Sequence, residues 1–334
     1  MTSYSGYMLR RFGQFVLVVF IGINLAFLIT HLTPIDPIEQ TISAATSFGS
    51  TSPEAIAMMR QALRELYGLE GGLWQQYAAF WKRIAVGDFG PSLSAFPTPV
   101  SDLIWRALPW TVGLLSVSTL LTWCLGNLLG GLAGYFQKSS MLRFAGVLAM
   151  GFHPIPYYIT AFVLLIVFGY LWPVLPITGG YRMSMPRGFN VDFILSVAQH
   201  SILPVLSLMI VGLGGWFMGM RALVSNIVSE DYVQYAELGG VARRRILTSY
   251  IMRNALLPQV TGLAMSLGAI FNGAIITEQV FGYPGIGTLL VSAVHAGDYS
   301  LVLGLTTVSI IAVSAAVLLI DLLYPLLDPR VKVR

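Results

Sequence analysis

Charged residues are scarce in this chain, and their scarcity excludes most classes of soluble protein. They make up only 10% of the 334 residues, whereas 56% are hydrophobic and the mean hydropathy is +0.74. A soluble globular domain carries about 25% charged residues. We therefore predict an integral membrane protein. The single cysteine, Cys124, lies in an apolar segment and excludes both a disulfide framework and a cysteine metal site.

Residues that would form a nucleotide-binding or catalytic site are also missing. The sequence has three lysines, none of which follows a glycine-rich run, so it contains no G-x-x-x-x-G-K-S/T phosphate loop. Its four histidines are widely spaced and match no metal-ligand motif. No arrangement of serine and histidine indicates an intramembrane protease. We expect no catalytic residue, no metal site and no cofactor in this chain, and we expect no nucleic-acid partner because the basic residues lie at loop ends.

What the chain does have is six long apolar segments. Each is long enough for the roughly 20 residues with which an α-helix crosses a bilayer. With the N-terminus inside, 12 of the 19 lysines and arginines fall on the cytoplasmic side, and the positive-inside rule then places both termini in the cytoplasm. We predict an all-α polytopic membrane protein with six transmembrane helices. They cover residues 12–32, 109–136, 142–172, 201–223, 257–280 and 301–324.

Two parts are predicted within this plan. Residues 1–108 comprise the first span and a large extracytoplasmic loop with amphipathic helices. Residues 109–334 form a five-span core with a cytoplasmic coupling loop at 224–256.

The outer loop contains two predicted amphipathic helices. The first begins at Ser52-Pro53-Glu54, with proline at the first helical position, and ends at Gly68. The second places aromatic residues on one face. The two helices could lie on the bilayer surface, with tryptophan at the headgroup level, or could contribute to the outer vestibule or to receptor docking. The residues that mark the second helix are Trp74, Tyr77, Trp81 and Ile84.

The central loop contains the only lengthy polar stretch in the second half of the chain, residues 229–258. Ser229 or Asp231 can cap a short helix over 232–238, with acidic groups at its positive N-terminal end. Gly239-Gly240 should end this helix, because glycine accepts the left-handed conformation of a helix stop. A short capped helix across a cytoplasmic loop is a surface that another protein can grip.

This stretch resembles the EAA loop of binding-protein-dependent ABC importers, which docks into the ATP-binding subunit. In the dipeptide, oligopeptide and nickel permease branch the loop reads approximately D-Y-V-R-T-A-R-A-K-G, followed by R-N-A-L-x-P. Here Gln234, Glu237 and Gly239 replace the usual basic residues, so the helix carries less positive charge. The resemblance implies that this coupling helix docks through Asp231, Tyr232, Val233, Tyr235, Ala236, Glu237, Gly239, Gly240 and Arg243.

Other motifs of the same branch follow in order along the chain. Residues 31–37 and 87–93 resemble L-x-P-G-D-P and G-D-L-G-x-S, with Ile35 in place of a glycine. Residues 278–287 resemble E-x-x-F-x-x-P-G-I/L-G, which belongs to the outer gate region in that branch. The outer-gate candidates are therefore Glu278, Phe281, Pro284 and Gly285.

The C-terminal part continues the resemblance. Asp298-Tyr299 matches part of R-D-Y-P-x-V-x-G, and the end of the chain matches D-x-x-Y-x-x-x-D-P-R from Asp321 to Arg330. Asp321 falls near the cytoplasmic end of the last span, where a charge is tolerable. We interpret it as an interfacial residue that pairs with an arginine of the tail.

The third and fourth spans contain candidates for the translocation path. His153-Pro154-Ile155-Pro156 should kink the third span, because two prolines free backbone carbonyls. His153, Tyr157 and Met209 are the pathway candidates. The favoured alternative is packing, with His153 near a membrane interface and with the glycines and methionines of the fourth span allowing close helix approach.

The resemblance covers essentially the whole chain and implies the fold of an ABC type I importer permease. Such a subunit is not an enzyme and forms half of the translocation pathway. The implied partners are a second homologous permease, two ATP-binding subunits that bind ATP and Mg, an extracytoplasmic solute-binding protein, and the lipid of a bacterial or archaeal cytoplasmic membrane.

The substrate is left open by the sequence. Peptides are the default for this branch, and a nickel chelate is an alternative. Oligosaccharides are another, because the outer loops are rich in aromatic residues. An ion-coupled secondary transporter is a more remote alternative, since no mid-membrane ion pair or internal repeat is evident. The aromatic residues concerned are Trp74, Trp81, Trp105, Trp110 and Tyr181.

Overall fold

A computed structural model describes most of the chain. The described residues are 4–32, 42, 52–66, 71–186, 188, 190–268, 270 and 274–327. Every element within them is a helix, which confirms the all-α prediction. Of the motif at 31–37, only residues 31 and 32 are described. Gly68 and the part of the terminal motif after Leu327 also lie outside the described residues.

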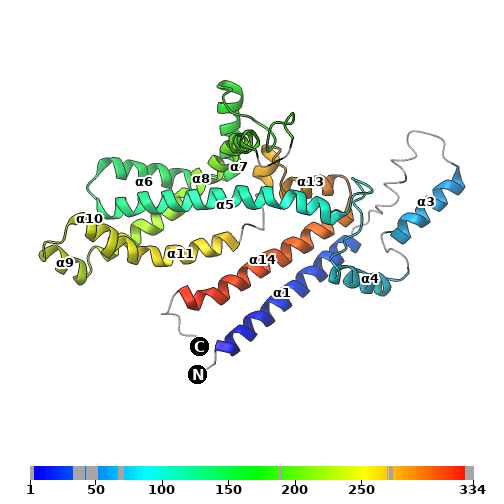
Figure 1. The fold of residues 1–334 in the computed structure, drawn as a ribbon, viewed down its shortest axis with the longest axis horizontal. Coiled ribbons are helices and arrows are strands. Elements are labelled where there is room, and N and C mark those ends of the chain that lie inside the picture. Colours follow the sequence, from blue (N-terminus) through cyan, green and yellow to red (C-terminus); the bar gives the residue numbers. More distant parts are fainter. Residues whose placement is uncertain are drawn as a thin grey trace.

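Among the described residues, four helices are long and apolar enough to cross a membrane. Two of them are the first and last helices of the described chain, and the other two lie between these in the sequence (Figure 1). They correspond to the predicted first, second, fourth and last spans, but the second and fourth begin earlier than predicted, at Val100 and Val191 rather than at 109 and 201. They are α1 (Tyr4–Leu32), α5 (Val100–Tyr135), α8 (Val191–Ile227) and α14 (Tyr299–Leu327).

The other two predicted spans differ from the prediction. The third is split into α6 (Ser140–Phe152) and α7 (Tyr157–Leu165), the latter continued by the π-helix η1 (Ile166–Leu171), and the two parts are bent by 104°. Pro154 and Pro156 lie at the bend, because neither can donate a backbone hydrogen bond. The described residues therefore contain four spans, or five if the bent pair crosses as one.

The fifth predicted span is not one helix either. It divides into α11 (Arg253–Gly268), of 16 residues, and α12 (Ile275–Val280), of six. Each is shorter than the roughly 20 residues of a span. A total of six transmembrane helices is thus not confirmed. A short α13 (Ile286–His295) separates α12 from α14.

A stripe of glycines brings α5 and α8 into close contact. A Cβ atom on Gly130 would lie 2.4 Å from the backbone oxygen of Phe217, and one on Gly126 would lie 2.6 Å from Cβ of Trp216. Gly134 continues the stripe one turn later, against Val224. Small residues four apart allow membrane helices to approach closely. The predicted glycines of the fourth span do the same for α6, since a Cβ on Gly214 would meet the backbone oxygen of Ala149 at 2.4 Å.

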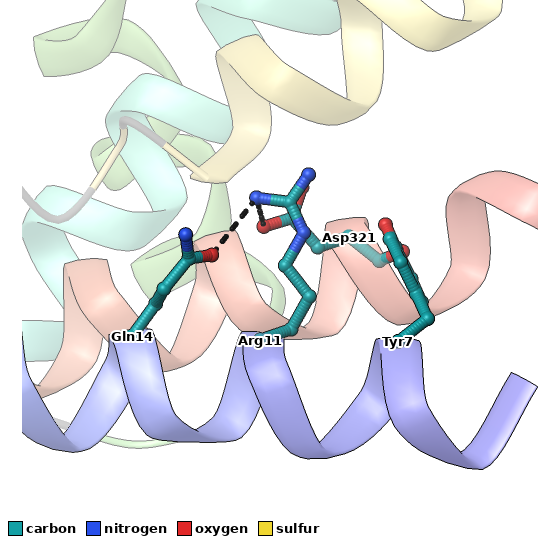
Figure 2. Close-up of polar contacts among 4 residues, drawn as sticks. All are labelled: Tyr7, Arg11, Gln14 and Asp321. Atoms are coloured by element: carbon teal, nitrogen blue, oxygen red, sulfur yellow. Dashed lines mark hydrogen bonds and ion pairs between the residues drawn. The ribbon is translucent and has the colours of Figure 1, made fainter. Parts of the chain in front are cut away.

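The two ends of the described chain are tied together. Arg11 Nη1 lies 3.1 Å from Asp321 Oδ2, and Tyr7 donates a hydrogen bond to the backbone oxygen of Asp321 (Figure 2). The antiparallel pair α1 and α14 thus begins and ends on one side of the membrane, in agreement with termini on a common side. The tail arginines lie outside the described residues, and the partner that the structure gives Asp321 is Arg11 of the opposite terminus.

The outer loop contains both predicted amphipathic helices. α3 (Pro53–Leu66) begins where expected, with the Ser52 hydroxyl accepting a hydrogen bond from the amide of Ala55. α4 (Leu73–Ala85) follows. Figure 1 shows these helices at the end of the molecule opposite α9 (Asp231–Leu238) and α10 (Arg243–Arg245).

Candidate functional site

The central loop folds into the short helix α9 (Asp231–Leu238), close to the predicted bounds. Its N-cap is Glu230, and no side chain caps the first turn, so the expected cap by Ser229 or Asp231 is wrong. The Ser229 hydroxyl instead donates a hydrogen bond to the backbone oxygen of Asn226. Asp231 is the first residue of the helix, where its carboxylate is stabilised by the positive end of the helix dipole.

The predicted glycine stop is confirmed. Gly240 has φ of +73°, a conformation that residues with a Cβ rarely adopt. Its amide bonds to the carbonyl of Glu237 at 3.0 Å, and the amide of Val241 bonds to the carbonyl of Ala236 at 3.1 Å. These two hydrogen bonds form a Schellman motif, which fixes the direction in which the chain leaves α9.

One face of α9 is packed on the rest of the chain. Val233 and Ala236, three residues apart, are both buried. They belong to a cluster with residues of α8, of the π-helix η2 (Ile246–Met252) and of α11, so these two predicted docking residues position the helix. The other buried members of the cluster are Met220, Val224, Ile246, Ile251 and Ala255.

The opposite face is exposed in the part of the chain that the structure describes. Tyr235 and Leu238 are 73% and 84% exposed, which is unusual for large apolar side chains. Asp231 and Glu237 are also exposed, as are Gly239, Gly240 and Arg243. The structure thus divides the predicted docking residues into a buried base and an exposed face.

Tyr232 links the two halves of the EAA-like motif. Its hydroxyl accepts a hydrogen bond at 3.1 Å from Asn254 Nδ2, and the same amide group donates at 2.8 Å to the backbone of Tyr250. Asn254 belongs to the R-N-A-L-L-P segment but was not among the predicted site residues. Only the matched motif itself, with its asparagine 22 residues after the tyrosine, could have indicated this contact.

α9 lies on the side of the membrane where the chain begins and ends. Tyr135, the last residue of α5, packs on the α9 cluster, whereas Val100 at its other end packs with Leu301 at the start of α14. α14 then runs back to Asp321. The predicted topology therefore places α9 in the cytoplasm, opposite the outer-gate candidates.

Glu278 is the centre of the outer-gate candidates and is completely buried. Its Oε1 accepts a hydrogen bond at 2.7 Å from the Thr111 hydroxyl of α5. Its Oε2 accepts from the amides of Gly287 at 2.7 Å and Thr288 at 3.3 Å. The Thr111 oxygen in turn accepts at 2.8 Å from the amide of Ile286. Glu278 and Thr111 thus satisfy the first three amides of α13, which would otherwise be orphaned at a helix start.

The glycines of this motif make room for the carboxylate. A Cβ on Gly285 would lie 2.4 Å from the carboxyl carbon of Glu278, and one on Gly287 would lie 2.6 Å from Cα of Ile275. Phe281 is buried in a cluster with Ala161 and Leu203. Together these contacts explain the spacing of glutamate, phenylalanine and the two glycines by packing and capping.

A second buried carboxylate, Asp298, joins two of the motifs. Its Oδ2 accepts hydrogen bonds from the hydroxyls of Ser92 and Ser94 and from the amide of Ser94. Its Oδ1 accepts from the amide of Leu301 in the first turn of α14. The motif at 87–93 and the motif that begins at Asp298 therefore meet, a contact that the sequence analysis did not predict.

The pathway candidates occupy separate positions. His153 Nδ1 lies 3.0 Å from the backbone oxygen of Val211 in α8, and its Cβ lies against Gly214. Tyr157 is exposed at the start of α7, and Met209 is half-buried in α8. The contacts of His153 are those of a packing residue, and lining of the path by these three side chains stays a prediction.

Comparison with known proteins agrees with this architecture. Residues 126–333 match the family described as the binding-protein-dependent transport system inner membrane component. The chain is 28% identical over 332 residues to the oligopeptide transport system permease protein AppB of Bacillus subtilis, covering 98% of this chain and 99% of the relative. It is 31% identical over 347 residues to the dipeptide transport system permease protein DppB of Escherichia coli K12, covering 98% of each.

A third relative is the probable D,D-dipeptide transport system permease protein DdpB of E. coli K12, with 29% identity over 336 residues and 96% of each chain covered. These matches span the apolar helices, the α9 loop and both buried carboxylates. They do not favour the secondary-transporter hypothesis. The chain belongs to the binding-protein-dependent transport system inner membrane components, and is a multi-pass permease subunit of an ABC importer.

Proposed function

We propose that this permease transports short peptides, as one of two homologous permease subunits that share one pathway. The names of its relatives, which are oligopeptide and dipeptide permeases, support the substrate class. An oligosaccharide site would need free aromatic faces. Trp110 instead stacks on Tyr181 with ring centroids 5.7 Å apart, and Trp81 stacks on Phe20 at 5.6 Å. Trp74 and Trp105, by contrast, are 82% and 69% exposed, so the aromatic residues alone do not decide against an oligosaccharide, and the proposal rests on the relatives.

The exposed face of α9 is proposed to dock into an ATP-binding subunit. The observation that carries this proposal is a helix whose one face is fixed by Val233 and Ala236 while the other presents Tyr235 and Leu238 to the cytoplasm. Buried aromatic and aliphatic anchors dominate the energy of protein interfaces. The groove that receives α9 should therefore hold an apolar recess, with basic groups opposite Glu237.

The cluster below α9 gives a route for coupling. Because Val233 and Ala236 share one core with α8 and α11, we expect a displacement of α9 to be transmitted to both helices. In the proposed cycle, separate subunits bind ATP and Mg, hydrolyse the ATP and move α9. The solute-binding protein delivers the peptide on the side of Glu278 and Asp298. Two ATP-binding subunits and a second permease complete the assembly.

A transport assay tests the substrate class. The chain would be reconstituted in vesicles with its co-purifying subunits, and uptake of labelled dipeptides, pentapeptides and maltooligosaccharides would be measured with the solute-binding protein and ATP. ATP-dependent uptake of peptides but not of oligosaccharides is expected. Uptake of an oligosaccharide alone, or uptake without ATP, would contradict the proposal.

A further inference from the structure

α4 has two chemically different faces. Its aromatic residues Tyr77, Phe80 and Trp81 lie on one side at helical spacing, whereas Gln75 and Lys82 lie on the other. A helix of this kind is typical of the boundary between water and hydrocarbon. The pattern alone does not decide between a bilayer and a protein partner.

The aromatic face of α4 is fastened to the first span. Tyr77 donates a hydrogen bond of 2.6 Å to Asn24 Oδ1, and Asn24 Nδ2 donates to the backbone of Phe20 within α1. Trp81 stacks on Phe20, and Phe27 packs its ring against Tyr77 and Phe80. Asn24 is thus a polar residue of an apolar span that binds the neighbouring helix, as expected where a bilayer supplies no hydrogen bonds.

The apolar side of α4 continues at the N-terminal end of the helix, beyond its contact with α1. Trp74 precedes Trp81 by seven residues, about two helical turns, so both lie on the same side of the helix. Trp74 is 82% exposed and Leu73 is 64% exposed. They lie next to the contact with α1, whose span Gly6–Ile29 is apolar and exposes Leu25. Figure 1 shows α4 beside the outer end of α1.

We propose that α4 lies in the outer leaflet boundary and that Leu73 and Trp74 contact lipid there. The occupant is lipid because the aromatic face of α4 is fastened to an apolar membrane span, and Leu73 and Trp74 are exposed on that same side of the helix. Tryptophan favours this level of the bilayer, since its ring is apolar and its N–H remains near water. The Asn24–Tyr77 hydrogen bond holds α4 at a fixed depth. Receptor docking by this surface is the competing outcome.

The single cysteine makes the test simple. A Cys124→Ala chain, assembled with its partner subunits in vesicles of phosphatidylethanolamine and phosphatidylglycerol, would receive one spin label at a time through Trp74→Cys, Gln75→Cys or Leu25→Cys. Gln75 is the control for water and Leu25 the control for lipid, because both are exposed in α4 and α1. Power saturation would compare access to oxygen, which partitions into lipid, with access to a water-soluble nickel chelate.

We expect the oxygen-to-nickel ratio at position 74 to be several-fold higher than at 75 and close to that at 25. A Tyr77→Phe change should lower the ratio at 74, because it releases α4 from Asn24. Nickel access at 74 equal to that at 75 would overturn the proposal in favour of a water-exposed helix. Protection from both reagents, or protection that appears only with the solute-binding protein, would overturn it in favour of a protein partner.

Discussion

Glu278 and Thr111 lie 167 residues apart in the chain and together cap α13. The contact joins the outer end of α5 to the motif that follows the fifth predicted span. No cation contributes to it among the described ion pairs, and neutral donors satisfy both carboxylate oxygens. The role that this geometry assigns to Glu278 is to hold α12, α13 and α5 in one arrangement.

Removal of the Glu278 carboxylate should therefore destabilise the permease. Glu278→Ala leaves two buried amides and a hydroxyl without their acceptor, and each such group costs about 1–3 kcal/mol. We expect a clear fall in the midpoint of thermal unfolding in detergent. Glu278→Gln is the control, because it keeps an acceptor for α13 and should lose less. Equal stability of both variants and the parent, with transport lost, would point to a direct role in transport instead.

The glycine beside this carboxylate offers a test of the packing. Gly285→Ala places a methyl group against the Glu278 carboxyl, and overpacking typically costs about 1–3 kcal/mol. Its φ of −93° is accessible to alanine, so the expected loss of thermal stability is steric.

The same change in a Glu278→Ala chain should cost much less, because neighbouring sites are coupled. Gly113→Ala in α5 has nothing within 4 Å of its new Cβ and should be neutral or stabilising, as alanine favours a helix. Additive losses for Gly285→Ala and Glu278→Ala would refute the contact.

The Asp298 contacts predict a local effect in the outer loop. Asp298→Ala frees Ser92 and Ser94 and should speed amide hydrogen exchange over 92–98, whereas exchange around α9 should not change. Asp102→Ala, an exposed acid in the first turn of α5, serves as the control. Unchanged protection of 92–98 in the Asp298 variant would show that Ser92 and Ser94 are held by other contacts.

The pair at the two chain ends predicts a small, reversible effect. Arg11 and Asp321 are partly exposed, and such pairs contribute about 0–1 kcal/mol. Arg11→Asp should lower the unfolding midpoint slightly, and Arg11→Asp combined with Asp321→Arg should recover it. A double variant that is no more stable than the single one would argue against direct pairing.

Local features of this chain were predictable, and long-range ones were not. The bounds of α9 and its stop at Gly239-Gly240 follow from the glycine pair and the polar run, which act within a few residues. The prolines at 154 and 156 predicted a kink but not its 104° angle, and both arms of the kink pack against α8. The capping of α13 by Glu278 and the hydrogen bond from Ser92 to Asp298 are contacts between residues far apart in the chain. A single sequence does not indicate such contacts. The fifth predicted span stays unconfirmed, since α11 ends at Gly268 and α12 begins at Ile275, and hydropathy over 257–280 does not report where a helix ends.

The central claim is that the exposed face of α9 binds an ATP-binding subunit, and co-purification in mild detergent tests it most directly. The variant is Tyr235→Ala with Leu238→Ala. A matched control, Met183→Ala with Val191→Ala, removes two exposed apolar side chains from the outer side. Loss of two interface anchors, at about 2 kcal/mol each, should weaken the complex by a factor on the order of 10³.

We predict that the parent chain and the control retain the ATP-binding subunits and their ATPase activity, and that the α9 variant loses both while its unfolding midpoint stays unchanged. A further variant, Gly240→Trp, separates two failures. If it releases the ATPase and the α9 variant does not, docking is correct but the anchors are not Tyr235 and Leu238. If the parent chain itself purifies folded and without any ATP-binding subunit, the account is contradicted.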